Sequence, residues 1–225
     1  MGQGISAVLT FAVGVAISPV PIIAVILMLF SAKARVNGPV FLAGWALALA
    51  VVSGAVYFLS DAASASTDTA TTDTISWGKI VFGALFLLLA ARNWRHRPAP
   101  GATAEMPKWM AGIDEFLPAK AFGLAVLLAG VNPKNLLLAA GAAAGLAQLG
   151  LSTSDAVVSL IVFVVLGSLT IAVPVVYYLV GGDKAKTELD SIKGWLAAHN
   201  AAVMTVLFVV FGVDLIAKGL GLLAG

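Results

Sequence analysis

The sequence predicts an all-α membrane protein whose six transmembrane helices form two inverted three-helix repeats. The first observation is composition: 60% of the 225 residues are hydrophobic and 11% are charged, against about 25% charged in an average soluble domain. The mean hydropathy is +1.02. The second observation is that charges gather between long apolar segments, and the third is a pair of proline motifs at matching places in two halves of the chain. This composition argues against a soluble enzyme.

Each predicted span is an apolar segment that is long enough, at about 18 residues or more, to cross the hydrocarbon core. The six spans are predicted at residues 5–30, 39–60, 75–92, 119–148, 155–181 and 199–221. The third is the shortest, and Lys79 near its start can extend its amine toward the interface. Barrel strands alternate polar and apolar residues, whereas these runs are apolar on all sides and indicate helices.

Lysine and arginine are concentrated on one side of this topology. With six spans, the loops after the first, third and fifth face the same side and hold Lys33, Arg35, Arg92, Arg95, Arg97, Lys108, Lys120, Lys184, Lys186 and Lys193. The other side holds Lys79 and Lys218. The positive-inside rule places the first set in the cytoplasm. The sequence therefore predicts a multi-pass protein with both termini extracytoplasmic.

The chain divides into two similar halves within a single transmembrane domain spanning 1–225. We assign residues 1–92 to the first repeat, 93–118 to a cytoplasmic connector with a short interfacial helix, and 119–225 to the second repeat. The first span carries Ser-Pro-Val-Pro from residue 18, and the fourth carries Asn-Pro-Lys-Asn from residue 132. Both third spans contain Val-Phe-Gly. Because each half has an odd number of spans, the halves are predicted to be inverted.

The proline motifs indicate that the first and fourth helices are broken. Proline inside a helix removes a backbone donor and clashes with the preceding turn, and in lipid the freed carbonyl needs a partner within the protein. Broken helices at matching places in inverted halves point to a transport site near the membrane midplane. The alternative is that both motifs are structural kinks.

Two ionisable residues lie inside predicted spans. Lys134 and Asp214 each lie about 21 Å from the cytoplasmic end of their helix, at 1.5 Å per residue, and a lone charge at that depth needs an inward-facing partner. We hypothesise that they face each other, to bind a charged head group or exchange protons. A static ion pair, or an Asp214 that extends to the outer interface, remains the alternative. The predicted translocation residues are Ser18, Pro19, Pro21, Asn132, Pro133, Lys134, Asn135 and Asp214.

Two other patterns concern helix packing and the membrane interface. Gly141 and Gly145 form a small-residue motif that permits close helix packing. The connector has an apolar face suited to the membrane interface, formed by Trp109, Ile113, Phe116 and Leu117. No arrangement of residues predicts an enzyme, a metal site, a cofactor or a nucleic-acid partner, and the chain has no cysteine.

The motifs from residues 18 and 132 resemble the paired motifs of the LysE superfamily of exporters. The approach Pro107-Lys108-Trp109 with Ile113-Asp114, leading into the motif at 132–135, resembles the GAP family, also called sulfolipid-1-addressing proteins. The resemblance implies a six-helix inverted-repeat exporter, often dimeric in the superfamily, that moves glycolipids or related envelope components across the actinobacterial inner membrane. It also implies that the broken-helix residues line the substrate path.

The expected function is therefore secondary export of an envelope lipid, glycolipid or precursor by alternating access. Two alternatives remain: an exporter of amino acids or other small solutes, and a non-transporting membrane scaffold for envelope-lipid synthesis. A laterally open cleft favours the lipid exporter, whereas a closed polar cavity favours the small-solute exporter. The scaffold predicts that changes in the connector abolish function while changes at Lys134 and Asn135 do not.

Overall fold

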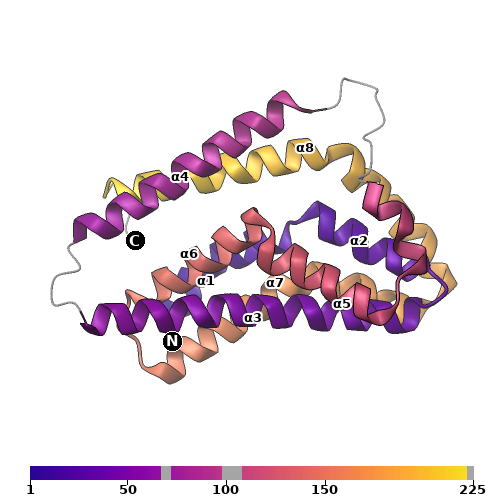
Figure 1. The fold of residues 1–225 in the computed structure, drawn as a ribbon, viewed down its shortest axis with the longest axis horizontal. Helices are drawn as coiled ribbons and strands as arrows, with labels where there is room; N and C mark the ends of the chain where they lie inside the picture. Colours follow the sequence, from indigo (N-terminus) through magenta and orange to yellow (C-terminus); the bar gives the residue numbers. More distant parts are fainter. Residues whose placement is uncertain (67–71, 98–107, 222–225) are drawn as a thin grey trace. The chain divides into compact units, whose positions relative to one another are not determined.

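The computed structural model describes residues 1–66, 72–97 and 108–221, which form helices joined by short turns (Figure 1). These residues contain eight α-helices, a 3-10 helix (η1) and a π-helical turn (η2). The elements are α1 (Gly2–Ala16), α2 (Pro19–Phe30), α3 (Ala34–Ser66), α4 (Thr72–Arg95), η1 (Lys108–Glu115), α5 (Pro118–Val126), η2 (Leu127–Val131), α6 (Pro133–Ala147), α7 (Thr153–Gly181) and α8 (Asp183–Gly219). The predicted all-α class is confirmed.

The helices are those of a multi-pass membrane protein. Among the described residues, α3, α7 and α8 are each long and apolar enough to cross a membrane. Two bent pairs, α1 with α2 and α5–η2 with α6, raise the number to five if each pair is one span. The predicted third span falls on α4, which is not among these five and which includes Lys79, Arg92 and Arg95.

Both predicted breaks are present, and proline begins the second helix of each bent pair. Pro19 and Pro133 occupy the first turn of α2 and α6, where a missing N–H goes unused and the fixed φ suits a helix start. The axes bend by 56° at the first break and by 60° at the second. The second break follows the π-helical turn, in which the Asn132 N–H donates to Leu127 O at 3.0 Å.

The chain forms two compact units, each of which takes helices from both sequence halves. The first unit comprises 1–61 and 105–197, and the second comprises 62–104 and 198–225. The first unit therefore holds both bent pairs, α7 and most of α3.

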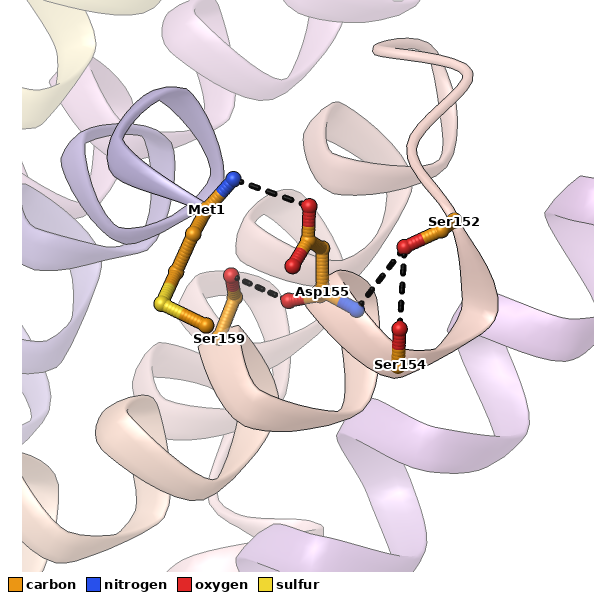
Figure 2. A network of polar contacts seen from close by, with 5 residues as sticks. All are labelled: Met1, Ser152, Ser154, Asp155 and Ser159. Atoms are coloured by element: carbon orange, nitrogen blue, oxygen red, sulfur yellow. Dashed lines mark hydrogen bonds and ion pairs between the residues drawn. The ribbon is translucent and has the colours of Figure 1, made fainter.

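In the first unit, α1 packs against α6 and α7. Its start lies beside the start of α7, where the Met1 amine donates to Asp155 Oδ2 at 3.0 Å (Figure 2). Its end lies beside the middle of α7, where Thr170 Oγ1 donates to Ala16 O at 2.6 Å. The two helices therefore run parallel.

Helix α3 has the opposite direction to α7 and the same direction as α5. The Asn37 side chain donates to Phe116 O at 2.8 Å, just before α5, and the Trp45 indole donates to Gly167 O of α7 at 3.2 Å. Further along α3, Ala48 lies beside Gly130 of η2. These contacts place the starts of α3 and α5 at one end of the unit.

The connector and the last helix depart from the prediction. The short helix η1 packs against α2, and Ile113 is fully buried within the protein, whereas the sequence placed this side chain at the membrane interface; residues 98–107 and the side chain of Trp109 lie outside the described part. Helix α8 begins at Asp183, not at residue 199. It starts early because Ala185 and Leu189 form a buried face within its charged first segment.

In the second unit, α4 packs against the later part of α8. Phe86 lies between Phe208 and Phe211, with ring centroids 5.8 and 6.1 Å away. The backbones approach so closely at Gly83 and Gly212 that a Cβ on Gly83 would lie 2.7 Å from Gly212 O. The two Val-Phe-Gly motifs found in the sequence thus meet in the structure.

Candidate functional site

The two helix breaks meet in the first unit, and Lys134 connects them. Its Nζ donates to Gly14 O at 2.7 Å, to Ile17 O at 2.9 Å and to Ser18 Oγ at 2.6 Å. An ammonium group has three donors, so all three are used. Lys134 is 4% exposed. A lysine on the first turn of α6 is thus inserted into the carbonyl end of α1.

The end of α1 suits a cation for a reason found in every helix. The last carbonyls of a helix have no partner within it, and the aligned peptide dipoles give that end a partial negative charge of about half a unit. Here the break ends α1 before α2 begins, which leaves the oxygens of Gly14 and Ile17 for Lys134. The positive charge of the ammonium balances the partial negative charge of these oxygens. Their hydrogen bonds in turn offset the desolvation cost of burying the ammonium.

Polar side chains on both breaks complete the arrangement. Ser18 Oγ lies 2.6 Å from Val15 O and 3.1 Å from Asn135 Oδ1, and its single proton is available to either. The amide of Asn135 donates to Leu128 O at 2.9 Å, and Asn132 Oδ1 accepts the Lys134 N–H at 3.0 Å. Ser18 is 2% exposed and Asn135 is fully buried. We call Gly14, Ile17, Ser18, Lys134 and Asn135 the lysine cage.

The predicted residues at the breaks therefore divide into two groups. Ser18, Lys134 and Asn135 come together through side-chain contacts, as described above. Pro19 and Pro21 are buried in α2, whereas Pro133 is exposed. The prolines fix where the helices restart, and Asn132 caps α6.

Within its own compact unit, each of Lys134 and Asp214 has a nearby partner, and a pairing between the two residues stays a hypothesis. Lys218 Nζ lies 3.3 Å from Asp214 Oδ2, one helical turn away on α8. Residues at this spacing face each other on a helix surface, so Asp214 has a local partner. Lys134 donates to Gly14 of α1 and to Ile17 and Ser18 in the first break. Matching depth along two helices did not reveal these nearer partners.

The two glycines of the small-residue motif have different surroundings. A Cβ on Gly141 would lie 2.9 Å from the ring of Phe11, so α1 approaches α6 closely there. At Gly145 an added Cβ would meet no other heavy atom within 4 Å. Close packing is therefore centred on Gly141.

Sequence reasoning missed the residues that act through their backbone. The carbonyls of Gly14 and Ile17 are two of the three partners of Lys134, and no side-chain pattern marks them. Thr170, which holds the last carbonyl of α1, was also missed. The signal that could have located the carbonyls is the position of Gly14 and Ile17 in the turn before Pro19, where helical carbonyls lose their donors.

An apolar groove lies beside the first break. Its volume is about 430 Å³, and its lining includes Ile22 of α2, Leu169, Thr170 and Val173 of α7, and Ile192 and Trp195 of α8. Val173 is 61% exposed and Trp195 is 56% exposed, so the groove is open along one side. Thr170 lines this groove and also donates to Ala16 O at the end of α1. The groove and the lysine cage are therefore neighbours.

Comparison with known proteins identifies the family of this chain. No curated protein and no solved structure gives a match. A family model described as Sap, sulfolipid-1-addressing protein, matches residues 8–221, nearly the whole chain. The match includes both breaks, every residue of the lysine cage and the groove. The chain therefore belongs to the sulfolipid-1-addressing protein family.

Proposed function

We propose that this membrane protein is a secondary exporter of an amphipathic envelope lipid or glycolipid, which works by alternating access around the two helix breaks. The observation that carries the proposal is the apolar groove beside the lysine cage. The groove accepts an acyl chain, and the breaks offer polar groups within a few residues of it. A single ligand with an apolar tail and a polar head fits both.

The form of the groove favours a lipid over a small solute. A small-solute exporter is expected to enclose a polar cavity, whereas this groove is apolar and open along α7. Helix α7 is among the most hydrophobic segments of the chain, with a mean hydropathy of 2.7 in its best window. Such a helix belongs in hydrocarbon, so a tail can enter the groove sideways from the bilayer.

The breaks supply charge for the head group. Helix α6 begins at Pro133, and a helix N-terminus favours an anionic group. In transporters with broken helices, such termini point at anionic substrates near the midplane. Lys134 lies on the same first turn, and its ammonium can exchange carbonyl oxygens for a phosphate, sulfate or carboxylate. The favoured substrate is therefore anionic at its head.

Helix α4 is proposed as the remaining span, which gives six. Because α3 and α5 run in the same direction, the chain must return between them by roughly the length of α3. With 24 residues, α4 extends about 36 Å, enough to cross the hydrocarbon. Trp77 and Trp94 are 66% and 49% exposed near its two ends, as expected for interfacial tryptophans.

The positive-inside rule then orients the protein as the sequence predicts, with both termini extracytoplasmic. The Asn37–Phe116 contact supports this orientation, because it places Arg35 and Lys120 near the same end of the first unit. The meeting of the proline motifs, and of the two Val-Phe-Gly motifs, supports an inverted repeat. Equivalent elements of a two-fold arrangement are expected to meet near its axis.

The proposal is tested by lipid movement in vesicles that contain the purified protein. Probes are an anionic phospholipid and a glycolipid, each with a fluorescent tail label on one leaflet, and an impermeant quencher reports transfer. Val173→Trp fills the groove, and Val165→Trp, at a 55% exposed position two turns earlier on α7, is the control. The bulky ring is expected to raise the barrier to passage of the tail by at least about 1.4 kcal/mol, which slows transfer at least about tenfold, and the control keeps the wild-type rate.

Two outcomes would contradict the proposal. If wild-type vesicles move neither lipid but release a labelled amino acid, the protein exports small solutes. If the protein moves nothing in vesicles while its deletion changes the envelope lipids of cells, it acts as a scaffold. A parallel comparison of envelope lipids in cells with and without the gene separates these cases.

A further inference from the structure

The lysine cage has the composition of a cation site. Its oxygens are two backbone carbonyls and one hydroxyl, which lie 2.6 to 2.9 Å from Lys134 Nζ. Asn135 adds an amide oxygen 3.1 Å from Ser18 Oγ. Neutral oxygens of this kind replace the hydration shell of K⁺ in channel filters. In broken-helix transporters, the carboxyl ends of half-helices hold the coupling cation.

The ammonium of Lys134 occupies the position among these oxygens that a free monovalent cation would take. It carries one positive charge, and in the described part of the chain its hydrogen-bond partners are two carbonyl oxygens and one hydroxyl oxygen. The side chain comes from α6, whereas its ligands come from Gly14 of α1 and from Ile17 and Ser18 in the first break. The cation is thus tethered to one broken helix and bound by the other.

We propose that the oxygens at the end of α1 form a site for a monovalent inorganic cation, which the ammonium of Lys134 fills in this structure. When Lys134 turns to an anionic ligand, K⁺ or Na⁺ takes its place among the same oxygens. This second step rests on the proposed export of an anionic lipid, whereas the site itself does not. The inference names the chemical class of the coupling ion.

The first experiment removes the tethered cation. Lys134→Ala leaves the oxygens in place, and its melting temperature in detergent is measured while KCl or NaCl replaces N-methylglucamine chloride at constant ionic strength. A bound ion stabilises the folded state with the logarithm of its concentration above Kd. We expect the melting temperature of Lys134→Ala to rise with the KCl or NaCl concentration. The melting temperatures of wild type and of Lys120→Ala, which changes an exposed lysine, are expected to stay constant.

A ligand variant tests whether the cage is the place of binding. Adding Ser18→Ala to Lys134→Ala removes one oxygen, so the ion concentration needed for the same shift is expected to rise at least tenfold. If Lys134→Ala melts at the same temperature in KCl, NaCl and N-methylglucamine chloride, the cation site is excluded. An ion effect that Ser18→Ala leaves unchanged places the ion elsewhere and overturns the proposal too.

A second variant allows a covalently attached ammonium to be put back at position 134. It provides an independent test if Lys134→Ala folds poorly. The chain has no cysteine, so Lys134→Cys offers a single thiol to 2-aminoethyl methanethiosulfonate, which returns an ammonium one atom longer than lysine. The modified protein is expected to lose its response to K⁺ and Na⁺, whereas a neutral methyl disulfide keeps it. An equal response in both forms contradicts the proposal.

These measurements use no lipid. A negative ion result therefore does not contradict lipid export, and a failure to move lipid does not contradict the cation site.

Discussion

Replacing Lys134 by methionine is predicted to destabilise the first unit, because it removes the ammonium and keeps the apolar stem. Three hydrogen bonds to Gly14 O, Ile17 O and Ser18 Oγ disappear. Methionine is close to lysine in length, so little cavity forms. The change therefore isolates the polar part of the lysine cage.

The magnitude follows from the oxygens that lose a partner. Ser18 Oγ keeps Val15 O and Asn135 Oδ1 within reach, so it is not stranded. Gly14 O and Ile17 O lose a charged donor, and each buried unsatisfied group costs about 1–3 kcal/mol. The free energy of unfolding is therefore predicted to fall by about 2–6 kcal/mol, less whatever water recovers at the helix end.

The assay is reversible unfolding in mixed micelles, in a buffer whose only added cation is N-methylglucamine. Lys120→Met, at an exposed position on α5, is the control and is expected to stay within about 0.5 kcal/mol of wild type. If Lys134→Met unfolds at the same free energy as this control, the carbonyl end of α1 does not depend on the ammonium. The account of the lysine cage given above would then be refuted.

Three further changes test the packing and the separate charges. Gly83→Ala is predicted to lower stability by about 1–3 kcal/mol, since its Cβ would lie 2.7 Å from a backbone oxygen; Gly78→Ala on the same helix meets nothing within 4 Å and should not. Thr170→Val removes one hydrogen bond to α1 and should cost about 1 kcal/mol in the same assay. Asp214→Asn breaks a partly exposed pair with Lys218; a loss above about 1 kcal/mol or a change in lipid transfer would contradict its local role.

The sequence predicted what depends on composition along the chain. Apolar segments with few charges marked the five candidate spans, because the hydrocarbon core requires a long stretch of apolar residues. The proline motifs marked both breaks because proline acts on its own turn. Three predicted side chains, Ser18, Lys134 and Asn135, meet in one place, so residue types at the breaks identified much of the site.

The rest could not be predicted because it depends on lateral position. Lys134 and Asp214 were matched by depth, yet depth along two helices says nothing about the angle at which each side chain leaves its helix. The carbonyl partners of Lys134 belong to Gly14 and Ile17, whose side chains carry no polar signal. The early start of α8 was missed because its charges concealed the face formed by Ala185 and Leu189.

The long separation between the two halves of the cage has a consequence for biogenesis. Lys134 lies 116 to 120 residues after its partners, and α1 also packs against α6 and α7, which are made late. During synthesis the first broken helix therefore has no partner for its terminal carbonyls until α6 is made. A nascent chain that stops before Pro133 has no ammonium to bind the carbonyl oxygens at the end of α1. Assembly of the site is thus a late step, and the incomplete chain is a natural target for quality-control proteases.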